Sequence, residues 1–379
     1  MRTMQKMMIS AVLVVAFVAL FVPLQGFCQD ASEEAAIENK VANLQSRFHA
    51  DRESAVSSLS VSSGTALAKV ENAAESAWIP GRICALRTLS IMAPEKTIQR
   101  LAEAANEKDI TLRLGAAKIA EGLGIEGAKK LYPLLEKETD DKKAALRNII
   151  ASACDRQVKK MLSEIMNSPE GNGQFPGQYR KLTSIGSVIE PALSRIVEET
   201  SSGYGEAAAA SLAELGDKAA IPALRKAYLD NNLELKLIAA ATLHILGANE
   251  EYKEIEKLLT DNCGKGNSYD YTQLALFYDR AREYGKGTEI LKLQIARFGG
   301  SPQDHINLAC FLSVQNKVEE AFAEFVKGVE KGYSNMEWVK IDGELANLRN
   351  TKQFQSFVRT KFPEEFKDVK ESEKDKENE

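Results

Sequence analysis

Few residues of this chain have the types and spacing that chemistry at a protein site requires. The three histidines, His49, His244 and His305, lie far apart in the sequence and belong to no metal-ligand motif. Acidic pairs such as Glu198 and Glu199 could transfer protons, but they fall at the ends or exposed faces of expected helices. We therefore expect no catalytic residue, no metal ion and no cofactor, and we predict that the protein is not an enzyme.

Two other stretches could bind phosphate groups, and neither has the pattern that such binding needs. The glycine-rich stretch GNGQFPG at 171–177 lacks the Lys-Ser/Thr pair of a phosphate loop, so we interpret it as part of an extended loop. The basic pairs Lys129-Lys130 and Lys159-Lys160 stand alone in separate segments. With a formal net charge of −5, the chain is not expected to attract nucleic acid.

The N-terminus has the pattern of a secretory signal peptide. Arg2 and Lys6 precede an apolar run from Ile9 to Val22, which is shorter than the roughly 20 residues that span a bilayer. We predict a cleaved signal peptide at 1–28 and an exported protein, periplasmic or extracellular, with no stable membrane insertion after cleavage. Lipidation of Cys28 or an uncleaved N-terminal anchor are the minor alternatives, and Phe27 disfavours the first.

The remaining four cysteines are interpreted as thiols rather than as a disulfide framework. They are Cys84, Cys154, Cys263 and Cys310. An exported protein reaches a compartment where disulfides form. Cys84 and Cys154, however, occupy different positions in segments that are not neighbours, so we expect buried free thiols. Whether any disulfide forms stays open at this point.

The elements that carry these residues follow a repeat of 30 or 31 residues. Its marker positions, each preceded by an apolar residue, are Ala93, Gly124, Asp155, Gly186, Gly216 and Gly247. Apolar residues spaced by three or four on both sides of the markers predict a pair of helices in every copy. Glycine at four of the six markers suits a left-handed turn that ends the first helix.

These copies resemble the HEAT-repeat family in its short form. The stretches GSVIEPAL from Gly186 and GDKAAIPAL from Gly216 carry the resemblance, which covers residues 78–260. It implies an all-α fold, an α-solenoid of stacked antiparallel helix pairs, over residues 31–262. The Gly- and Pro-containing stretch at 168–179 predicts an extended loop that interrupts the stack.

Beyond Cys263 the period becomes 34 residues. The recurring pairs are Leu274 and Leu308, Ala275 and Ala309, Tyr278 and Leu312, Gly287 and Ala321, and Leu291 and Phe325. They resemble tetratricopeptide repeats, and the segment 335–358 resembles the block that closes such arrays in bacterial proteins. Its carriers are Trp338, Asp342, Leu345, Leu348 and Phe354. We therefore expect a tetratricopeptide-like domain at 267–362 and a disordered charged tail at 363–379.

A solenoid offers a surface rather than a pocket, which favours a binding function. We expect a non-enzymatic protein-protein interaction scaffold in the bacterial cell envelope; the alternative is a dedicated regulatory or assembly subunit of one envelope enzyme or secretion complex. The partner would be a protein or peptide. The expected peptide groove is lined by the exposed face of each first helix of the second repeat type, at Thr272, Leu276, Asp279, Ile306, Cys310 and Ser313. Packing against a neighbouring repeat is the alternative role for each.

Overall fold

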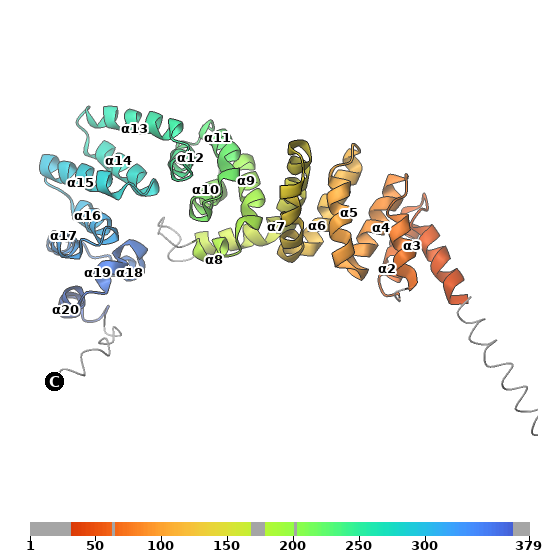
Figure 1. Ribbon diagram of the computed structural model, residues 1–379. Helices are drawn as coiled ribbons and strands as arrows, with labels where there is room; N and C mark the ends of the chain where they lie inside the picture. Colours follow the sequence, from red (N-terminus) through yellow and green to blue (C-terminus); the bar gives the residue numbers. More distant parts are fainter. Residues whose placement is uncertain (1–31, 63–64, 168–178, 201–202, 367–379) are drawn as a thin grey trace, which may run out of the picture. The chain divides into compact units, whose positions relative to one another are not determined.

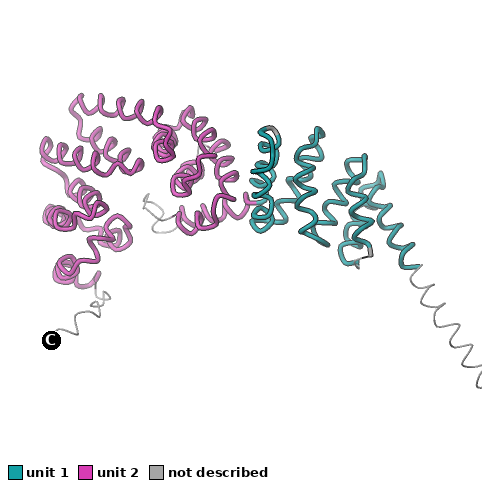
Figure 2. The backbone as a smooth tube through the Cα atoms, viewed as in Figure 1, with its two compact units in different colours: residues 1–153 teal, residues 154–379 magenta. Residues whose placement is uncertain are grey.

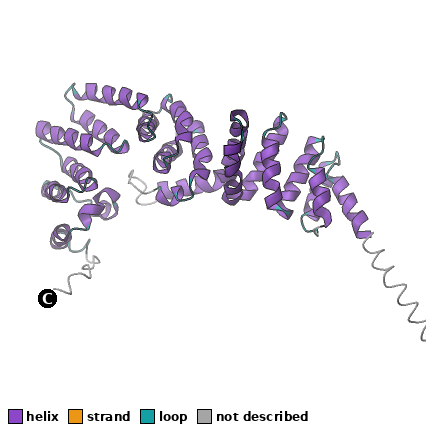
Figure 3. Cartoon of the chain, in the orientation of Figure 1, coloured by secondary structure: helices purple, strands orange, loops and turns teal. Residues whose placement is uncertain are grey.

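The protein is all-α. The computed structural model describes residues 32–62, 65–167, 179–200 and 203–366, and within these ranges every regular element is a helix and none is a strand (Figures 1 and 3). Helices that follow one another along the chain pack against one another, so the solenoid-like, all-α fold expected from the sequence is confirmed. The predicted signal peptide, the core of the predicted loop at 168–178 and the tail after Phe366 lie outside the described residues.

The chain forms two compact units, residues 1–153 and 154–379 (Figure 2). The boundary falls inside one helical span, α7 (Asp140–Met166). The change of period near residues 262–267 therefore lies within the second unit.

The N-terminal unit begins with a helical stretch at 32–43. The elements that follow are α2 (His49–Leu59), α3 (Thr65–Ala73), α4 (Ile79–Met92), α5 (Pro94–Ala105), α6 (Ile110–Leu131) and η1 (Tyr132–Lys137), before α7. α4 packs on both α2 and α6, so these three first helices are neighbours. Buried leucines such as Leu59, Leu89 and Leu101 form the interior between the pairs.

Four glycines end or break helices, as predicted. Gly124, Gly186, Gly216 and Gly247 have φ of 62°, 91°, 71° and 91°, a region that costs glycine nothing. The marker at Asp155 behaves differently, since it lies inside α7 and its backbone is not left-handed. Its carboxylate instead pairs with Arg195 at 3.0 Å, within the C-terminal unit.

The C-terminal unit continues as a series of shorter helices. Its elements are α8 (Arg180–Thr183), η2 (Ser187–Ile189), α9 (Glu190–Glu199), α10 (Gly203–Leu215), η3 (Lys218–Ala220), α11 (Ile221–Tyr228), α12 (Leu233–Ile245), α13 (Glu250–Cys263), α14 (Ser268–Arg280), α15 (Tyr284–Phe298), α16 (Pro302–Val314), α17 (Val318–Glu330), α18 (Met336–Ile341), η4 (Gly343–Leu345), α19 (Ala346–Arg349) and α20 (Lys352–Lys361).

Local sequence signals set where these helices begin. Asn232 and Asn267 cap α12 and α14 through their side-chain oxygens. Ser301 and Asp304 form a reciprocal capping box at the start of α16. The buried Asp304 carboxylate also accepts a hydrogen bond from Gln294 at 3.0 Å, which ties α16 to α15.

The C-terminal segment packs against α16 and α17. Leu345, Leu348 and Phe354 are buried in one apolar cluster with Phe325 of α17, and the Phe325 and Phe354 rings lie 4.9 Å apart. Phe366, which the sequence assigned to the charged tail, is also buried against Phe354.

The four cysteines within the described ranges are buried and are not disulfide-bonded, as expected for structural thiols. None of the described helices combines the length and the apolar character needed to cross a bilayer.

Candidate functional site

The six residues of the expected peptide groove fall into two groups with opposite exposure. On α14, Thr272 and Asp279 are half-buried and Leu276 is 37% exposed. On α16, by contrast, the side chains of Ile306, Cys310 and Ser313 are buried. The exposure expected of the α16 residues is therefore not found.

The chain itself covers the α16 face. η4 and α19 pack on α16, and the backbone N–H of Leu348 donates to the Ser313 hydroxyl at 3.2 Å. The amide of Asn347 donates to the Ser313 carbonyl at 2.8 Å. A peptide could reach Ile306, Cys310 and Ser313 only after the closing segment had moved away, so for these three residues the packing alternative applies.

The α14 end of the expected groove borders a small hollow in the C-terminal unit. It is lined by Tyr179, Ala210, Ala213, Glu214, Ile238, Thr242, Ile245, Asp279, Arg280, Arg282 and Tyr284, and its volume is about 70 Å³. Pockets that enclose a small molecule usually measure about 300–1,000 Å³, so this hollow suits a single inserted side chain. Its arginines are already paired, Arg282 with Glu214 at 3.1 Å and Arg280 with Glu234.

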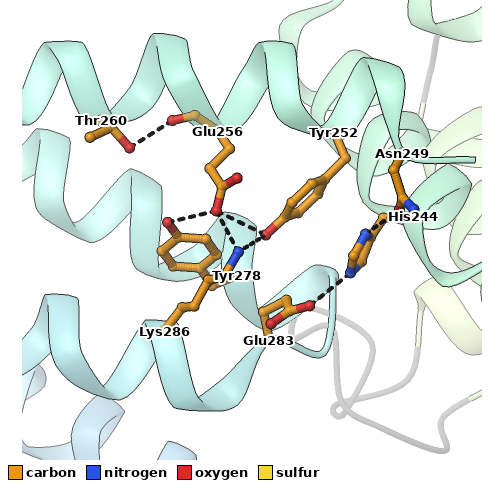
Figure 4. Close-up of polar contacts among 8 residues, drawn as sticks. All are labelled: His244, Asn249, Tyr252, Glu256, Thr260, Tyr278, Glu283 and Lys286. Carbon is orange, nitrogen blue, oxygen red and sulfur yellow. Dashed lines mark hydrogen bonds and ion pairs between the residues drawn. The ribbon is translucent and has the colours of Figure 1, made fainter.

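A polar network joins the helix pair α12–α13 to the pair α14–α15 (Figure 4). Three groups donate to the same oxygen, Oε1 of Glu256: the Lys286 ammonium at 2.7 Å, the Tyr278 hydroxyl at 3.1 Å and the Tyr252 hydroxyl at 3.3 Å. The Lys286 ammonium also lies 5.3 Å from the centre of the Tyr252 ring.

A histidine continues this network on its other side. The ring of His244 stacks on Tyr252 with centroids 4.1 Å apart, while its nitrogens contact Asn249 at 2.6 Å and Glu283 at 2.8 Å (Figure 4). Every polar atom of the ring thus has a partner from a neighbouring helix or turn. His244 therefore packs between α12, α13 and the turn before α15.

The electrostatics of the network favour a structural role over proton transfer. Burial raises the pKa of Tyr252 and of Tyr278 above the usual tyrosine value, and the nearby Glu256 carboxylate raises both further. Burial alone would also raise the pKa of Glu256, but the hydrogen bonds from Lys286, Tyr278 and Tyr252 outweigh it, and the pKa lies below the usual value. The two phenols therefore stay protonated near neutral pH and act as hydrogen-bond donors to Glu256.

Sequence reasoning missed a second polar cluster, which lies where the closing segment meets α16. The Cys310 thiol donates to Oδ2 of Asp342 at 3.2 Å, and ligand-type atoms of Cys310, Asp342 and Glu344 all lie within 4.8 Å of one another. Glu344 also hydrogen-bonds to Asp279 of α14. The members come from segments more than 30 residues apart and contain no histidine, so no short motif announces them.

Burial perturbs the acids of this second cluster. It raises the pKa of Asp342 to about 6, and it raises the pKa values of Asp279, Glu344 and the Cys310 thiol. Arg349 is the cation beside Asp342, and its guanidinium donates to the backbone carbonyls of Val339 and Asp342.

The N-terminal unit presents a row of exposed apolar side chains that the sequence analysis also missed. Phe48, Trp78 and Ile110 stand at the N-terminal ends of the adjacent helices α2, α4 and α6, and they are 66%, 37% and 63% exposed. We call these three residues the apolar row. Two larger hollows of this unit, of about 450 and 680 Å³, are open furrows between helices, and acidic side chains line the larger one.

A repeated local turn presents the two aromatic members of the apolar row, whereas Ile110 follows Asp109, which caps α6. The backbone N–H of Phe48 donates to the Ser46 hydroxyl at 3.2 Å, and the N–H of Trp78 donates to the Ser76 hydroxyl at the same distance. Each aromatic residue then occupies an N-cap position and makes no capping hydrogen bond from its side chain. Ser, Thr, Asp or Asn at this position would stabilise the helix by about 1 kcal/mol. Placing large exposed rings where polar caps are favoured sacrifices local stability, which is typical of binding surfaces.

Comparisons with known proteins identify no family. The chain matches no protein-family model and no curated protein. One solved structure that it resembles is the crystal structure of an engineered protein, with 14% sequence identity, a match over 83% of this chain and 98% of that chain, and a TM-score of 0.28. A likeness at that TM-score says nothing about function.

Proposed function

We propose that the protein is an exported, non-enzymatic scaffold that binds a protein partner through the apolar row of its N-terminal unit. The observation that carries the proposal is the repetition of exposed Phe48, Trp78 and Ile110 at equivalent ends of three adjacent helices. Contiguous apolar side chains on a soluble protein mark interaction surfaces, and Trp and Arg are enriched among residues that dominate binding energy.

Arginines accompany each member of the row. Arg52 lies over the Trp78 ring at 5.3 Å and donates to the Ser46 carbonyl at 2.8 Å. Arg82 and Arg113 follow Trp78 and Ile110 at similar spacing along their helices. Arg82 is already paired with Glu107 at 3.1 Å. Arg52 and Arg113 therefore supply the positive charge beside the row, which suits a partner segment that presents apolar and acidic residues.

The hollows of the described residues do not enclose a substrate-sized space. The hollow beside α14 measures about 70 Å³, well below the volume that encloses a substrate, and the two larger ones in the N-terminal unit are open furrows. The polar network around Glu256 holds phenols whose pKa is raised rather than lowered. Export is proposed from the sequence of residues 1–28, in which a basic start precedes an apolar run.

The test is site-specific photo-crosslinking in the producing cells, with a photoreactive residue at position 78 or 110. Ile91 is the matched control, because it lies at the other end of α4 and is 56% exposed. We expect one and the same protein to crosslink from 78 and 110 but not from 91. Equal crosslinking from all three positions, or no protein from 78 and 110, would contradict the proposal.

The same experiment separates a general scaffold from a dedicated subunit. Several partners crosslinked at 78 and 110 would favour the scaffold, and a single partner that copurifies in equal amounts would favour a regulatory or assembly subunit of one complex. In either case Trp78→Ser should weaken binding by roughly 30-fold or more, the loss expected of a binding hot spot, whereas Ile91→Ser should not.

A further inference from the structure

Positive charge beside the apolar row is not neutralised by ion pairs among the described residues. The cations that form no ion pair there are the exposed Arg47 and Lys108 and the half-buried Arg52 and Arg113. The two half-buried arginines instead donate to backbone carbonyls, at 2.8 and 3.0 Å. The neighbouring acids Asp51 and Asp109 already accept hydrogen bonds, from the Ser46 hydroxyl and the N–H of Leu112. An excess of positive charge thus accompanies the exposed apolar side chains, although the chain as a whole has a formal net charge of −5.

The members of the row recur at the spacing of neighbouring helices. α4 packs on α2 and on α6, and helices in contact have axes about 8–10 Å apart. Glycine brings α4 and α6 close together, because a Cβ atom at Gly115 of α6 would lie 2.8 Å from Cδ1 of Ile83 on α4. A partner element that contacts every member of the row must therefore present an apolar side chain about every 8–10 Å.

That spacing selects a helix over an extended strand. In an α-helix, residues seven positions apart lie on the same face and are about 10.5 Å apart along the axis. In a strand, residues on one face recur every second position, so their separations are about 6.6 Å or about 13 Å. A helix with an apolar residue at every seventh position therefore follows the row, whereas a strand falls out of step with it.

The central member of the row is fixed before any partner binds. The Trp78 ring lies against Gly81, where a Cβ atom would be 2.8 Å from Cε3 of the ring. The Arg52 guanidinium lies 5.3 Å from the ring centre, and the N–H of Trp78 is held by the Ser76 hydroxyl. A ring that is already held in place loses little conformational freedom on binding, so Trp78 suits the role of an anchor.

We propose that the occupant of the apolar row is an acidic amphipathic helix of a partner protein, with apolar residues seven positions apart and Asp or Glu on both flanks. This inference rests on the proposed function and adds the secondary structure and the charge of the partner segment. The helix lies across α2, α4 and α6 and needs at least about 15 residues to contact all three members of the row. Its carboxylates face the unpaired cations Arg47, Arg52, Lys108 and Arg113.

The test places a photoreactive phenylalanine analogue at position 48, 78 or 110 of the full chain in the producing cells. Mass spectrometry then locates the crosslinked residue in the partner for each position. We expect the three crosslinked residues to advance by about seven per step in one direction along a single partner segment. An extended segment would advance by only about three residues per step.

Charge reversal tests the acidic character of the helix. Arg47→Glu and Lys108→Glu change exposed side chains, and each should lower the crosslinking yield from position 78 at least about threefold. Lys118→Glu is the matched control, because Lys118 is exposed about two turns further along α6 and pairs with Glu121. It should leave the yield unchanged. Far-ultraviolet circular dichroism of the purified variants verifies that each is folded.

The outcomes separate this inference from the proposed function. Steps of about three residues, or crosslinks without a constant direction, would overturn the helix while the proposed function stands. Equal yields in Arg47→Glu, Lys108→Glu and Lys118→Glu would overturn its acidic character, and crosslinks to a second copy of this chain would overturn a separate partner. If no protein crosslinks from 78 and 110, both the inference and the proposed function fail.

Discussion

Arg282 and Asn316 lie 34 residues apart and share a left-handed backbone conformation, with φ of 60° and 59°. Each follows the last turn of a first helix, α14 or α16, and each is followed by an N–H that reaches back five residues, Glu283 to Tyr278 and Lys317 to Leu312. This is the Schellman arrangement, in which glycine is usual. Gly247 makes the same turn after α12, so glycine is replaced in the two later copies.

The strain at Asn316 predicts an unusual order of stability. Asn316→Ala should lower the free energy of unfolding by about 1 kcal/mol, because alanine tolerates the left-handed region less well than asparagine. Asn316→Gly should be neutral within about 0.5 kcal/mol, since relief of strain offsets the greater freedom of the unfolded chain. Urea denaturation of the three proteins measures both differences.

A helical position in the next element supplies the control. Ala323 is exposed in the middle of α17, and Ala323→Gly should cost about 1 kcal/mol. The preference for glycine over alanine at 316 should thus be reversed at 323. If alanine were at least as stable as glycine at position 316, the left-handed turn would not be the reason for asparagine there.

Close packing of α15 on α16 predicts the effect of a single methyl group. A Cβ atom at Gly287 would lie 1.9 Å from Cε1 of Phe311, whereas a Cβ atom at Gly285, two residues earlier, meets nothing within 4 Å. Gly287→Ala should therefore lower the free energy of unfolding by about 1–3 kcal/mol through overpacking. Gly285→Ala should be neutral or stabilising by up to about 1 kcal/mol. Thermal unfolding of Gly287→Ala and Gly285→Ala tests this prediction. Equal Tm values would show that the Phe311 side chain moves aside without loss of stability.

The sequence was informative wherever a structural rule acts over a few residues. The positive φ of Gly124, Gly186, Gly216 and Gly247, the burial of the thiols and the burial of Leu345, Leu348 and Phe354 all follow from local periodicity or residue type. A helix period fixes which face is apolar, so the core could be predicted without knowing the partner elements.

Features that depend on pairing between distant segments could not be predicted in this way. Cys310 was assigned to an exposed groove and Asp342 to the closing block. No pattern in either stretch predicts that the Cys310 thiol lies 3.2 Å from Oδ2 of Asp342. The apolar row had a signal that was missed: Ser46-Arg47-Phe48 and Ser76-Ala77-Trp78 place a serine two residues before an exposed ring, 30 residues apart. Asp155 has the spacing of a marker but lies inside α7. Unlike glycine, aspartate does not favour a positive φ strongly enough to end a helix.

The burial of Cys154 predicts slow thiol chemistry. Burial raises the pKa of its thiol to about 12, so only a very small fraction is thiolate at pH 8. Iodoacetamide should therefore leave Cys154 unmodified in the native protein and modify it fully in urea, as read by mass spectrometry of the peptides. Cys84 is 8% exposed, more than Cys154, so it is the internal comparison and should react sooner. Rapid native modification of Cys154 would mean that α7 opens locally.

The network around Glu256 predicts a stability difference that depends on pH. Its pKa is lowered in the folded protein, so its carboxylate contributes stability above the unfolded value of about 4.3 and loses that contribution as the pH falls through the lower folded value. Glu256→Gln should lower the free energy of unfolding by about 1 kcal/mol at pH 7, because the hydrogen bonds from Lys286, Tyr278 and Tyr252 lose their charged acceptor and Lys286 is partly screened by solvent.

The pH profile distinguishes this cause from a general disturbance of packing. As the pH falls through the lowered pKa of the folded state, the wild-type carboxyl group becomes protonated and resembles the glutamine amide, so the difference between the two proteins should shrink toward zero. Glu250→Gln is the control, since the Glu250 side chain is 86% exposed and its contact with Arg225 should contribute less at any pH. A deficit for Glu256→Gln that stayed constant from pH 7 down to the acid limit of the folded state would show that the shape of the Glu256 side chain, and not its charge, joins α13, α14 and α15.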